Sequence, residues 1–293
     1  MLTPSLTAIL QQEVINHRLP TDFLSTIESW YFPIAQELAK KHQEKKETIL
    51  INVNGSQGSG KSTLTAFLSL ILNHHLGINT IDISLDDFYL TKAQRLQLAK
   101  DVHPLLATRG VPGTHDLKLA TSCLTNLLQK QACTLPLFDK AQDDRANSDL
   151  WKKIDDSVDI ILFEGWCIDA PFQSENELKM PINELETKED PNGAWRKYVN
   201  EKLITYHQQF FNLSDYSVFL QIPNFEKVYE WRGLQEKKLA LDRHDQAVMK
   251  KQDIRRFIQH YERITRSCLK ILPVKADMVI KLNDEHKIVS LDF

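Results

Sequence analysis

Residues 48–63 read T-I-L-I-N-V-N-G-S-Q-G-S-G-K-S-T, and this stretch decides the fold. The apolar run at 49–53 predicts a buried strand, and the apolar spacing at 64, 67, 68 and 71 predicts a helix directly after the stretch. Between the two lies Gly55-x-x-x-x-Gly60-Lys61-Ser62, the pattern of a phosphate-binding loop in the strand–loop–helix context that this motif requires. An ordinary glycine-rich turn is the weaker alternative, because such a turn does not need this context.

Each residue type in the loop suits the binding of a nucleoside triphosphate. Glycines let backbone N–H groups turn toward phosphate oxygens, and the start of the following helix adds the positive end of its dipole. Lys61 can reach the β- and γ-phosphates, and the Ser62 hydroxyl can bind Mg²⁺. The residues expected to bind the nucleotide are Gly55, Ser56, Gln57, Gly58, Ser59, Gly60, Lys61, Ser62 and Thr63.

The composition is that of an ordinary soluble globular enzyme: of 293 residues, 42% are hydrophobic and 26% are charged. The net charge of −3 gives no reason to expect nucleic acid as a partner. The four cysteines, at positions 123, 133, 167 and 268, show no paired spacing, which argues against a zinc site or a disulfide framework. Since the N-terminus carries no secretory pattern and no apolar run is long enough to span a bilayer, we expect a cytoplasmic protein without a membrane partner.

Two carboxylates follow the second predicted strand. Residues 79–85 read N-T-I-D-I-S-L and lead into Asp86, Asp87, Phe88 and Tyr89. Ligands of open α/β sheets collect at the carboxyl ends of the strands, so we expect these side chains near the reacting groups. One carboxylate is placed to accept the proton of a substrate hydroxyl that attacks the γ-phosphate, and we predict that Asp86 is this base. The alternative, an Asp that only caps a strand-to-helix turn, is expected to hold for one of the pair. Asp87 and Tyr89 are then candidate substrate contacts.

The third predicted strand also ends in a carboxylate. Residues 158–163 are apolar at their centre and lead into Glu164, Gly165 and Trp166. A carboxylate at the end of a buried strand beside a phosphate-binding loop is typical of a Mg²⁺ site. We therefore predict that Glu164 and Ser62 hold the metal together.

Two polar loops carry further candidate residues for binding the acceptor. Residues 109–116 read R-G-V-P-G-T-H-D, in which Arg109 could bind a carboxylate through two parallel hydrogen bonds while His115 or Asp116 holds hydroxyls. A solvated loop with Asp116 as a helix N-cap is the alternative. Residues 139–145 form a charge-dense loop that, taken alone, is more typical of a solvated turn.

A basic and helical segment follows a fourth predicted strand at 216–222. Residues 231–270 hold eleven Lys or Arg against five carboxylates. A nucleic-acid face is one reading of such a segment, but the whole chain is slightly acidic and carries no readout motif. The segment instead suggests a lid that closes over the triphosphate and supplies cations to the transferring phosphoryl group. Arg232 is the best single candidate for that role, with Lys237 and Lys238 behind it.

Five further blocks stand in order along the chain: S-L-D-D-F-Y-L-T (84–91), R-G-V-P-G-T-H-D (109–116), L-P-L-F-D-K-A-Q-D-D-R (135–145), F-E-G-W (163–166) and H-Y-E-R-I-T-R (260–266). With the phosphate-binding loop they resemble the plant and bacterial D-glycerate 3-kinases, within the group of phosphoribulokinase, uridine kinase and pantothenate kinase. The resemblance runs from residue 49 to about 282. It implies D-glycerate as the acceptor, Asp139 and Arg145 as substrate or phosphate contacts, and Glu164 rather than Asp at the metal.

The sequence therefore predicts one α/β domain of the P-loop NTPase type, with a mostly parallel sheet wrapped by helices. Residues 1–47 are expected to form a helical preface, 48–224 the nucleotide and substrate core, 225–272 a basic helical lid, and 273–293 one or two closing strands. The predicted reaction is phosphoryl transfer from ATP, with Mg²⁺, to a hydroxyl of a small metabolite. The alternatives are a kinase for another hydroxylated metabolite, such as pantothenate or a nucleoside, and a P-loop regulatory ATPase.

Overall fold

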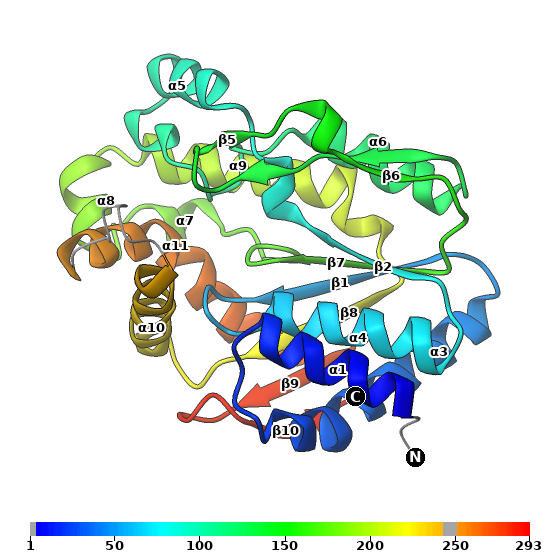
Figure 1. Cartoon of the computed structure of the whole chain (residues 1–293). Coiled ribbons are helices and arrows are strands. Elements are labelled where there is room, and N and C mark those ends of the chain that lie inside the picture. The colour runs from blue at the N-terminus through cyan, green and yellow to red at the C-terminus, as the bar shows by residue number, and fades with distance from the viewer. Residues whose placement is uncertain (1–3, 243–250) are drawn as a thin grey trace.

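A six-stranded sheet forms the centre of the molecule (Figure 1). The computed structural model describes residues 4–242 and 251–293, with the backbone alone at 235–242, 251 and 252. The strand order is β10-β9-β8-β1-β7-β2, in which β10 alone runs antiparallel to its neighbour. The strands are β1 (Ile49–Gly55), β2 (Thr80–Ser84), β7 (Ile160–Gly165), β8 (Tyr216–Gln221), β9 (Met278–Leu282) and β10 (Ile288–Asp292). The predicted strands and the mostly parallel sheet are confirmed.

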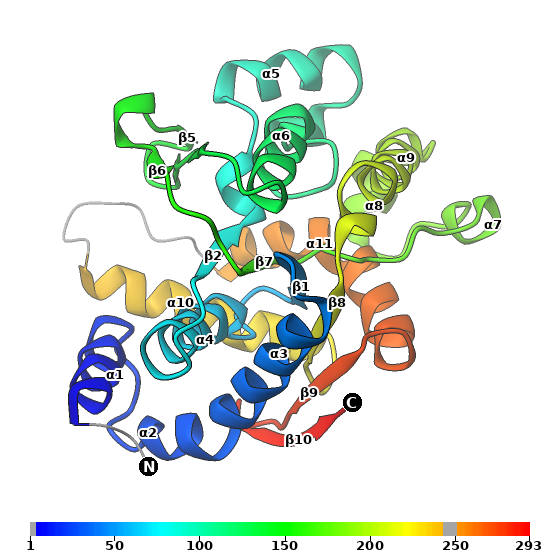
Figure 2. The ribbon, with the colours of Figure 1, turned by 90° about the vertical axis from the view of Figure 1, so that its right-hand side faces the viewer.

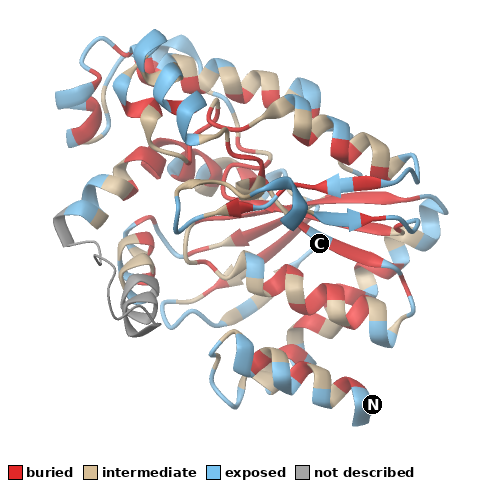
Figure 3. Cartoon of the chain, turned by 45° about the horizontal axis from the view of Figure 1, so that its top comes forward, coloured by how far each residue is buried: buried red, intermediate tan, exposed pale blue. Residues whose placement is uncertain are grey.

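Helices cover both faces of this sheet (Figure 2). One face carries the N-terminal helices and the helix after the phosphate-binding loop: α1 (Pro4–Asn16), α2 (Phe23–Thr26), a π-helical turn (Ile27–Tyr31), α3 (Phe32–Lys45) and α4 (Lys61–His75). The other face carries α6 (Leu117–Leu128), α9 (Ala194–Gln209) and α11 (Lys251–Ile271). The strands between the two helix layers are buried on both sides, while the outward faces of the helices are exposed (Figure 3).

The apolar spacing seen in the sequence after the loop becomes the buried face of α4. Leu64, Phe67, Leu68 and Ile71 are each at most 1% exposed, and they pack against the sheet and the N-terminal helices. Burying an aliphatic or aromatic side chain of this size contributes about 1.5–3 kcal/mol. This packing holds the start of α4 at a fixed place beside β1.

Smaller elements connect the layers. A hairpin of two short strands, β4 (Phe138–Asp139) and β5 (Asp144–Arg145), lies beside the 3₁₀ turn that follows β2. The other short elements are α5 (Lys92–Asp101), β3 (Cys133–Leu135), β6 (Lys152–Ile154), α7 (Glu175–Leu178), α8 (Glu184–Glu189) and the 3₁₀ turns Leu85–Phe88, Pro104–Ala107, Ser148–Leu150, Phe211–Leu213 and Leu272–Val274. None of the helices that the structure describes is long and apolar enough to cross a membrane.

The basic segment 225–272, which the sequence suggested as a helical lid, is divided between the surface and the core. It forms α10 (Glu226–Asp242) and α11, and the second half of α11 belongs to the core. Ile258, Tyr261 and Cys268 are at most 4% exposed, and Arg263 forms a buried ion pair of 2.6 Å with Glu186 of α8. The apolar residues between the basic ones follow a helical period, so the same helix carries cations outward and a packed stripe inward. A lid role remains a proposal for α10.

Candidate active site

The parallel strands bring the three predicted strand-end groups to one edge. Val53 of β1 is in register with Glu164 of β7, and Glu164 is in register with Ser84 of β2. The phosphate-binding loop, Glu164 and the pair Asp86–Asp87 therefore leave the sheet side by side. This is the carboxyl-end position at which open α/β sheets bind ligands.

The phosphate-binding loop turns on two glycines with left-handed backbone. Gly58 has φ 78° and Gly60 has φ 92°, and a Cβ on Gly58 would lie 3.0 Å from Cβ of Trp231. Gly60 is the N-cap of α4, so the first helical N–H groups face the loop. The buried hydroxyls of Ser56 and Ser59 have no hydrogen-bond partner among the described residues. Such orphaned donors fit phosphate oxygens.

The predicted metal pair lies in direct contact. Ser62 Oγ donates to Glu164 Oε1 at 2.8 Å, and Lys61 Nζ lies 3.7 Å from Glu164 Oε2. Glu164 is 5% exposed, and its Oε2 accepts no hydrogen bond in the described part of the chain. A hydroxyl and a carboxylate oxygen are hard ligands that suit Mg²⁺, which takes its remaining ligands from water and phosphates. The described residues contain no cluster of three or more His, Cys, Asp or Glu that would favour an all-protein metal site.

Asp86 and Asp87 have opposite environments on the 3₁₀ turn after β2. Asp86 Oδ1 accepts from the Tyr89 hydroxyl at 2.9 Å, and its Oδ2 accepts from Lys140 Nζ at 2.7 Å. Burial opposes ionisation of Asp86, but attraction to Lys140 and Lys61 outweighs it and holds the pKa of this carboxyl well below its usual range. Burial raises the pKa of Asp87 to about 6, although the N–H of Phe138 donates to it at 3.1 Å.

Backbone hydrogen bonds join the loop 109–116 to the residues that follow Asp86 and Asp87. Leu90 N donates to Thr114 O at 2.9 Å, and Asp116 N donates to Phe88 O at 2.7 Å. The loop 109–116 is held from the other side by α11, since the Tyr261 hydroxyl donates to Arg109 O at 3.2 Å. Gly110 has φ 139°, and a Cβ there would clash with the Tyr261 ring.

Arg109 and Arg145, the two arginines predicted to bind the phosphate-accepting substrate, already bind carboxylates and carbonyl groups of the protein itself. Arg109 forms an ion pair with Asp143 in the turn of the β4–β5 hairpin. Arg145 Nη2 donates to Tyr89 O at 2.9 Å and to Asp116 Oδ2 at 3.2 Å. The turn after β2, the loop 109–116 and the β4–β5 hairpin thus form one wall beside Asp86. Each arginine uses part of its guanidinium group to hold that wall together.

Two predicted acidic contacts act as caps in the structure. Asp116 Oδ1 accepts from Leu119 N at 3.1 Å, which makes it the N-cap of α6, as the alternative reading of that loop expected. Asp139 Oδ1 accepts from the N–H groups of Ala141 and Gln142 at 2.8 and 3.1 Å. This turn presents Lys140 toward Asp86. A direct contact of Asp116 or Asp139 with substrate stays a prediction.

His115 lies inside the same wall as a neutral group. Its ring stacks on Tyr89 at 4.4 Å, and its Nδ1 lies 2.8 Å from the hydroxyl of Tyr206. Burial lowers the pKa of His115 to about 3, against a smaller opposite effect of Asp86. Its buried Nε2 has no hydrogen-bond partner among the described residues. The geometry therefore allows His115 to bind a hydroxyl but not to supply a positive charge.

Arg232 lies in the first turns of α10, whose backbone borders Gly58 of the phosphate-binding loop. These turns are anchored by Phe225, Val228 and Trp231, each at most 5% exposed, and Trp231 packs against Gly58 of the loop. The Arg232 guanidinium lies 5.5 Å from the ring centre of Phe257 in α11. The side chains of Lys237 and Lys238 lie outside the described part of the chain.

Three residues beside the loops were not predicted from the sequence. Lys140 contacts Asp86, and the Trp231 ring stacks at 4.1 Å on His286 from the β9–β10 turn. A Cβ on Gly60 would lie 3.7 Å from His286 Nε2, so this aromatic pair borders the phosphate-binding loop. The only sequence signal was for Lys140, which stands inside a charge-dense block; nothing near residue 286 points to the loop.

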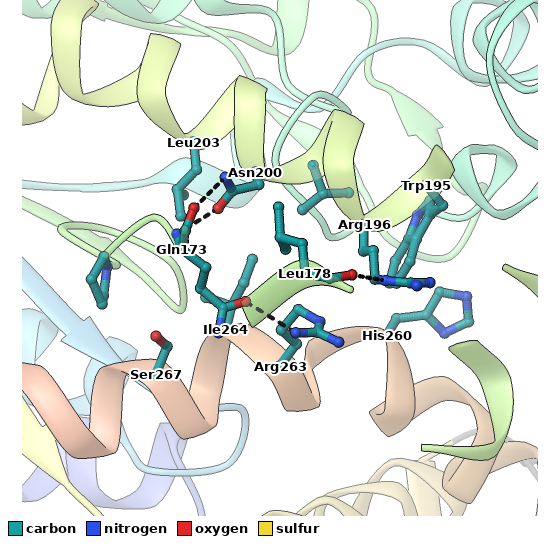
Figure 4. A pocket seen from close by; sticks show the side chains of 12 residues that line it. Gln173, Leu178, Trp195, Arg196, Asn200, Leu203, His260, Arg263, Ile264 and Ser267 are labelled. Atoms are coloured by element: carbon teal, nitrogen blue, oxygen red, sulfur yellow. Dashed lines mark hydrogen bonds between the residues drawn. The ribbon is translucent and has the colours of Figure 1, made fainter. Parts of the chain in front are cut away.

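Two hollows lie away from these residues. A cavity of about 20 Å³ between α9 and α11 is lined by Trp195, Arg196 and Arg263 (Figure 4). Arg196 donates to Leu178 O at 2.7 Å and pairs with Asp190 at 2.8 Å, which shows a structural role. A groove of about 760 Å³ over β8 is lined by Asp169, His207 and Phe211 among others. Neither hollow contains a residue predicted to act in the reaction.

The chain is similar to several known kinases. No family model matches it. It is 30% identical over 247 residues to the uncharacterized kinase mug58 of Schizosaccharomyces pombe, an alignment that covers 81% of this chain and 87% of that protein. It is also 30% identical over 223 residues to the chloroplastic D-glycerate 3-kinase of Arabidopsis thaliana, which covers 73% of this chain and 46% of the plant protein. The chain therefore spans about half the length of that relative.

A solved structure has the same fold. The D-glycerate 3-kinase from Cryptococcus neoformans superposes with a TM-score of 0.76 at 23% sequence identity, over 89% of this chain and 98% of the other. At that identity the likeness concerns the fold. It agrees with the arrangement of the sheet and its two helix layers.

Proposed function

Because this chain belongs to the D-glycerate 3-kinase family of P-loop kinases, we propose that it transfers the γ-phosphate of ATP to a hydroxyl of D-glycerate. The chain is a kinase of a small metabolite; the choice of acceptor is the proposal. The observation that carries it is the position of Asp86. Its carboxylate pairs with Lys140 at 2.7 Å, is attracted to Lys61 of the phosphate-binding loop, and is joined through Tyr89 to Arg145. A base beside the triphosphate and cations around it suit an anionic hydroxy acid.

In the proposed reaction, Asp86 accepts the proton of the substrate hydroxyl as that oxygen attacks the γ-phosphorus. The bond from phosphorus to the bridging oxygen breaks, and ADP leaves with the electron pair. Lys61 stabilises the charge that develops on the transferring oxygens, and Arg232 adds a second cation from α10. Mg²⁺ bound to the triphosphate supplies charge neutralisation, and Ser62 and Glu164 are the residues that would hold it.

The wall favours a carboxylate-bearing acceptor over a nucleoside. Lys140 contacts Asp86 directly, Arg145 is joined to it through Tyr89, and Arg109 is held by Asp143 in the same hairpin as Lys140. A purely hydrolytic ATPase needs only a positioned water and would not need three cations on the acceptor side. A cation on that side that can leave its internal partner would instead raise the affinity for an anion.

A coupled assay of ADP release tests the proposal. The enzyme is supplied with Mg²⁺ and ATP, and D-glycerate, glycerol, pantothenate or uridine is added in turn against a control without acceptor. We expect D-glycerate to stimulate ADP release well above the control, with phosphoglycerate as the second product. Stimulation by pantothenate or uridine and not by D-glycerate would overturn the acceptor, and an acceptor-independent rate would overturn the kinase assignment.

A further inference from the structure

The base of the proposed reaction is held by a cation from a different part of the chain. Lys140 lies in the turn between β4 and β5, and its ammonium group is 2.7 Å from Oδ2 of Asp86. We propose that Lys140 binds the carboxylate of the acceptor, and that it restrains Asp86 until an acceptor carboxylate draws it away. This inference rests on the proposed function and names the residue that selects an anionic acceptor.

The neighbouring cations are held by carboxylates that play no part in proton transfer. Arg95 is fully buried and pairs with Asp143 at 2.8 Å, and Arg109 pairs with the same carboxylate. Arg145 is 14% exposed and pairs with Asp116. Taking Arg145 from Asp116, or both Arg95 and Arg109 from Asp143, would leave a carboxylate without its ion pair inside the wall, which costs free energy.

Lys140 differs from these arginines in its partner and in its exposure. Its side chain is 58% exposed, and the carboxylate that it contacts is the proposed base. An ammonium group on a flexible four-carbon stem can turn from one carboxylate to another at little cost, whereas a planar guanidinium held in two directions cannot. Lys140 is therefore the cation of this wall that can change partner without breaking the wall.

While the ion pair is intact, Asp86 is a poor base. Both of its carboxylate oxygens already accept hydrogen bonds, Oδ1 from the Tyr89 hydroxyl and Oδ2 from Lys140. A base with a strongly lowered pKa also accepts protons weakly. When the ammonium group moves to an acceptor carboxylate, Oδ2 becomes free, and the second negative charge nearby raises the proton affinity of Asp86. Glycerol and water carry no charge with which to compete for Lys140.

The other groups facing Asp86 do not provide this change. Lys61 is placed for the phosphates and Glu164, and His115 is neutral because burial lowers its pKa to about 3. The charged and titratable groups that face Asp86 are Lys61 of α4, Asp87 and Tyr89 of the turn after β2, His115 of the loop before α6, Lys140 of the hairpin, Cys167 after β7 and Tyr261 of α11. Among these described groups, Lys140 combines a positive charge with an exposed, flexible side chain.

The test compares Lys140→Met, which keeps the length of the side chain, with Lys140→Arg and with the wild type. Lys197→Met, on the exposed face of α9, is the matched control. For Lys140→Met we expect kcat/KM for D-glycerate to fall about 10- to 100-fold, mostly through KM, while kcat/KM for glycerol stays level or rises. ATP hydrolysis without acceptor should rise several-fold, because Asp86 is no longer restrained. Lys140→Arg should keep the preference for D-glycerate over glycerol, and Lys197→Met should match the wild type.

Two results separate the failure of this inference from that of the proposed function. If the wild type phosphorylates D-glycerate and Lys140→Met retains its preference over glycerol, the role of Lys140 is wrong and the function stands. An equal loss with both acceptors, at unchanged thermal stability, also overturns the role, because it shows a structural effect only. If the wild type phosphorylates no hydroxy acid, the proposed function itself fails.

Discussion

The two walls of the candidate active site are built in different ways. The nucleotide wall consists of residues 55–63 at the end of β1, a strand that is buried along its whole length between β7 and β8. The acceptor wall consists of the turn after β2, the loop 109–116 and the β4–β5 hairpin, and ion pairs join these segments to one another. One wall is a single continuous motif, and the other is an assembly of side chains from distant segments.

The two walls differ in what fixes the positions of their functional groups. Backbone conformation sets the nucleotide wall, since left-handed glycines and a helix N-terminus fix the positions of the N–H groups. Ion pairs fix the positions of the groups in the acceptor wall, and the length of each side chain decides which charged groups come into contact. We therefore expect changes in the nucleotide wall to abolish catalysis and changes in the acceptor wall to alter rate and selectivity.

The largest expected effect is that of Lys61→Ala in the nucleotide wall. The lost cation stabilises the transferring phosphoryl group more than it stabilises bound ATP, so kcat should fall by about three orders of magnitude or more. Nucleotide binding should survive in weakened form, which a titration with a fluorescent ATP analogue measures. Turnover near that of the wild type would end the kinase mechanism proposed here.

The next effect is that of Asp86→Asn, at the junction of the two walls. The substitution keeps the shape of the side chain and removes the base, so kcat should fall roughly 10²- to 10⁴-fold with little change in KM for ATP. Asp87→Asn should cost less, because Asp87 binds the backbone of Phe138 and not a reacting group. Steady-state kinetics of both variants decide the assignment; a larger loss for Asp87→Asn would exchange the two roles.

A smaller effect is expected from Arg145→Lys in the acceptor wall. The lysine keeps the charge but loses the geometry with which Arg145 binds Tyr89 O and Asp116 together. We expect kcat/KM to fall about 10-fold for D-glycerate and for glycerol alike, since the change loosens the wall. Arg109→Lys is the companion variant. A loss confined to D-glycerate would show that the arginine binds the acceptor carboxylate itself, in place of Lys140.

The smallest effect concerns stability behind the nucleotide wall. Asn52 of β1 donates to Asp169 Oδ1 at 2.7 Å, and burial raises the pKa of Asp169 to about 7. Since this value lies above the usual range near 4 of an unfolded Asp, the wild type should lose stability as the pH rises from about 4 to 7. Asp169→Asn can still accept from Asn52 and tolerates the left-handed backbone at φ 55°.

We therefore expect Asp169→Asn to stabilise the protein by about 2 kcal/mol more at pH 8 than at pH 5. Urea unfolding of both proteins at the two pH values measures the difference. A gain of equal size at both pH values would assign the effect to the backbone, and no gain would show that Asp169 is ionised at little cost.

The sequence predicted the parts of the molecule whose structure is local. The strands of the sheet, the phosphate-binding loop and the groups that follow β2 and β7 all stand where hydrophobic period and motif spacing placed them. The segment 225–272 shows the limit of such reasoning. Its charges suggested a lid over the triphosphate, and they did not reveal that α11 buries the apolar residues between those charges against α8 and α9. Charge counted along a segment does not say which face of a helix carries it.

By itself, the sequence determined the nucleotide wall, because a loop of nine consecutive residues is fixed by its own backbone angles and by the strand and helix on either side. Only the tertiary structure decided which charges meet in the acceptor wall. Lys140 and Asp86 are 54 positions apart, and Arg109 and Asp143 are 34 apart. Ion pairs carry no pattern along the chain, since any cation can pair with any carboxylate that the fold brings within reach. The packing of the β4–β5 hairpin beside the turn after β2 therefore brought Lys140 into contact with Asp86, the proposed base.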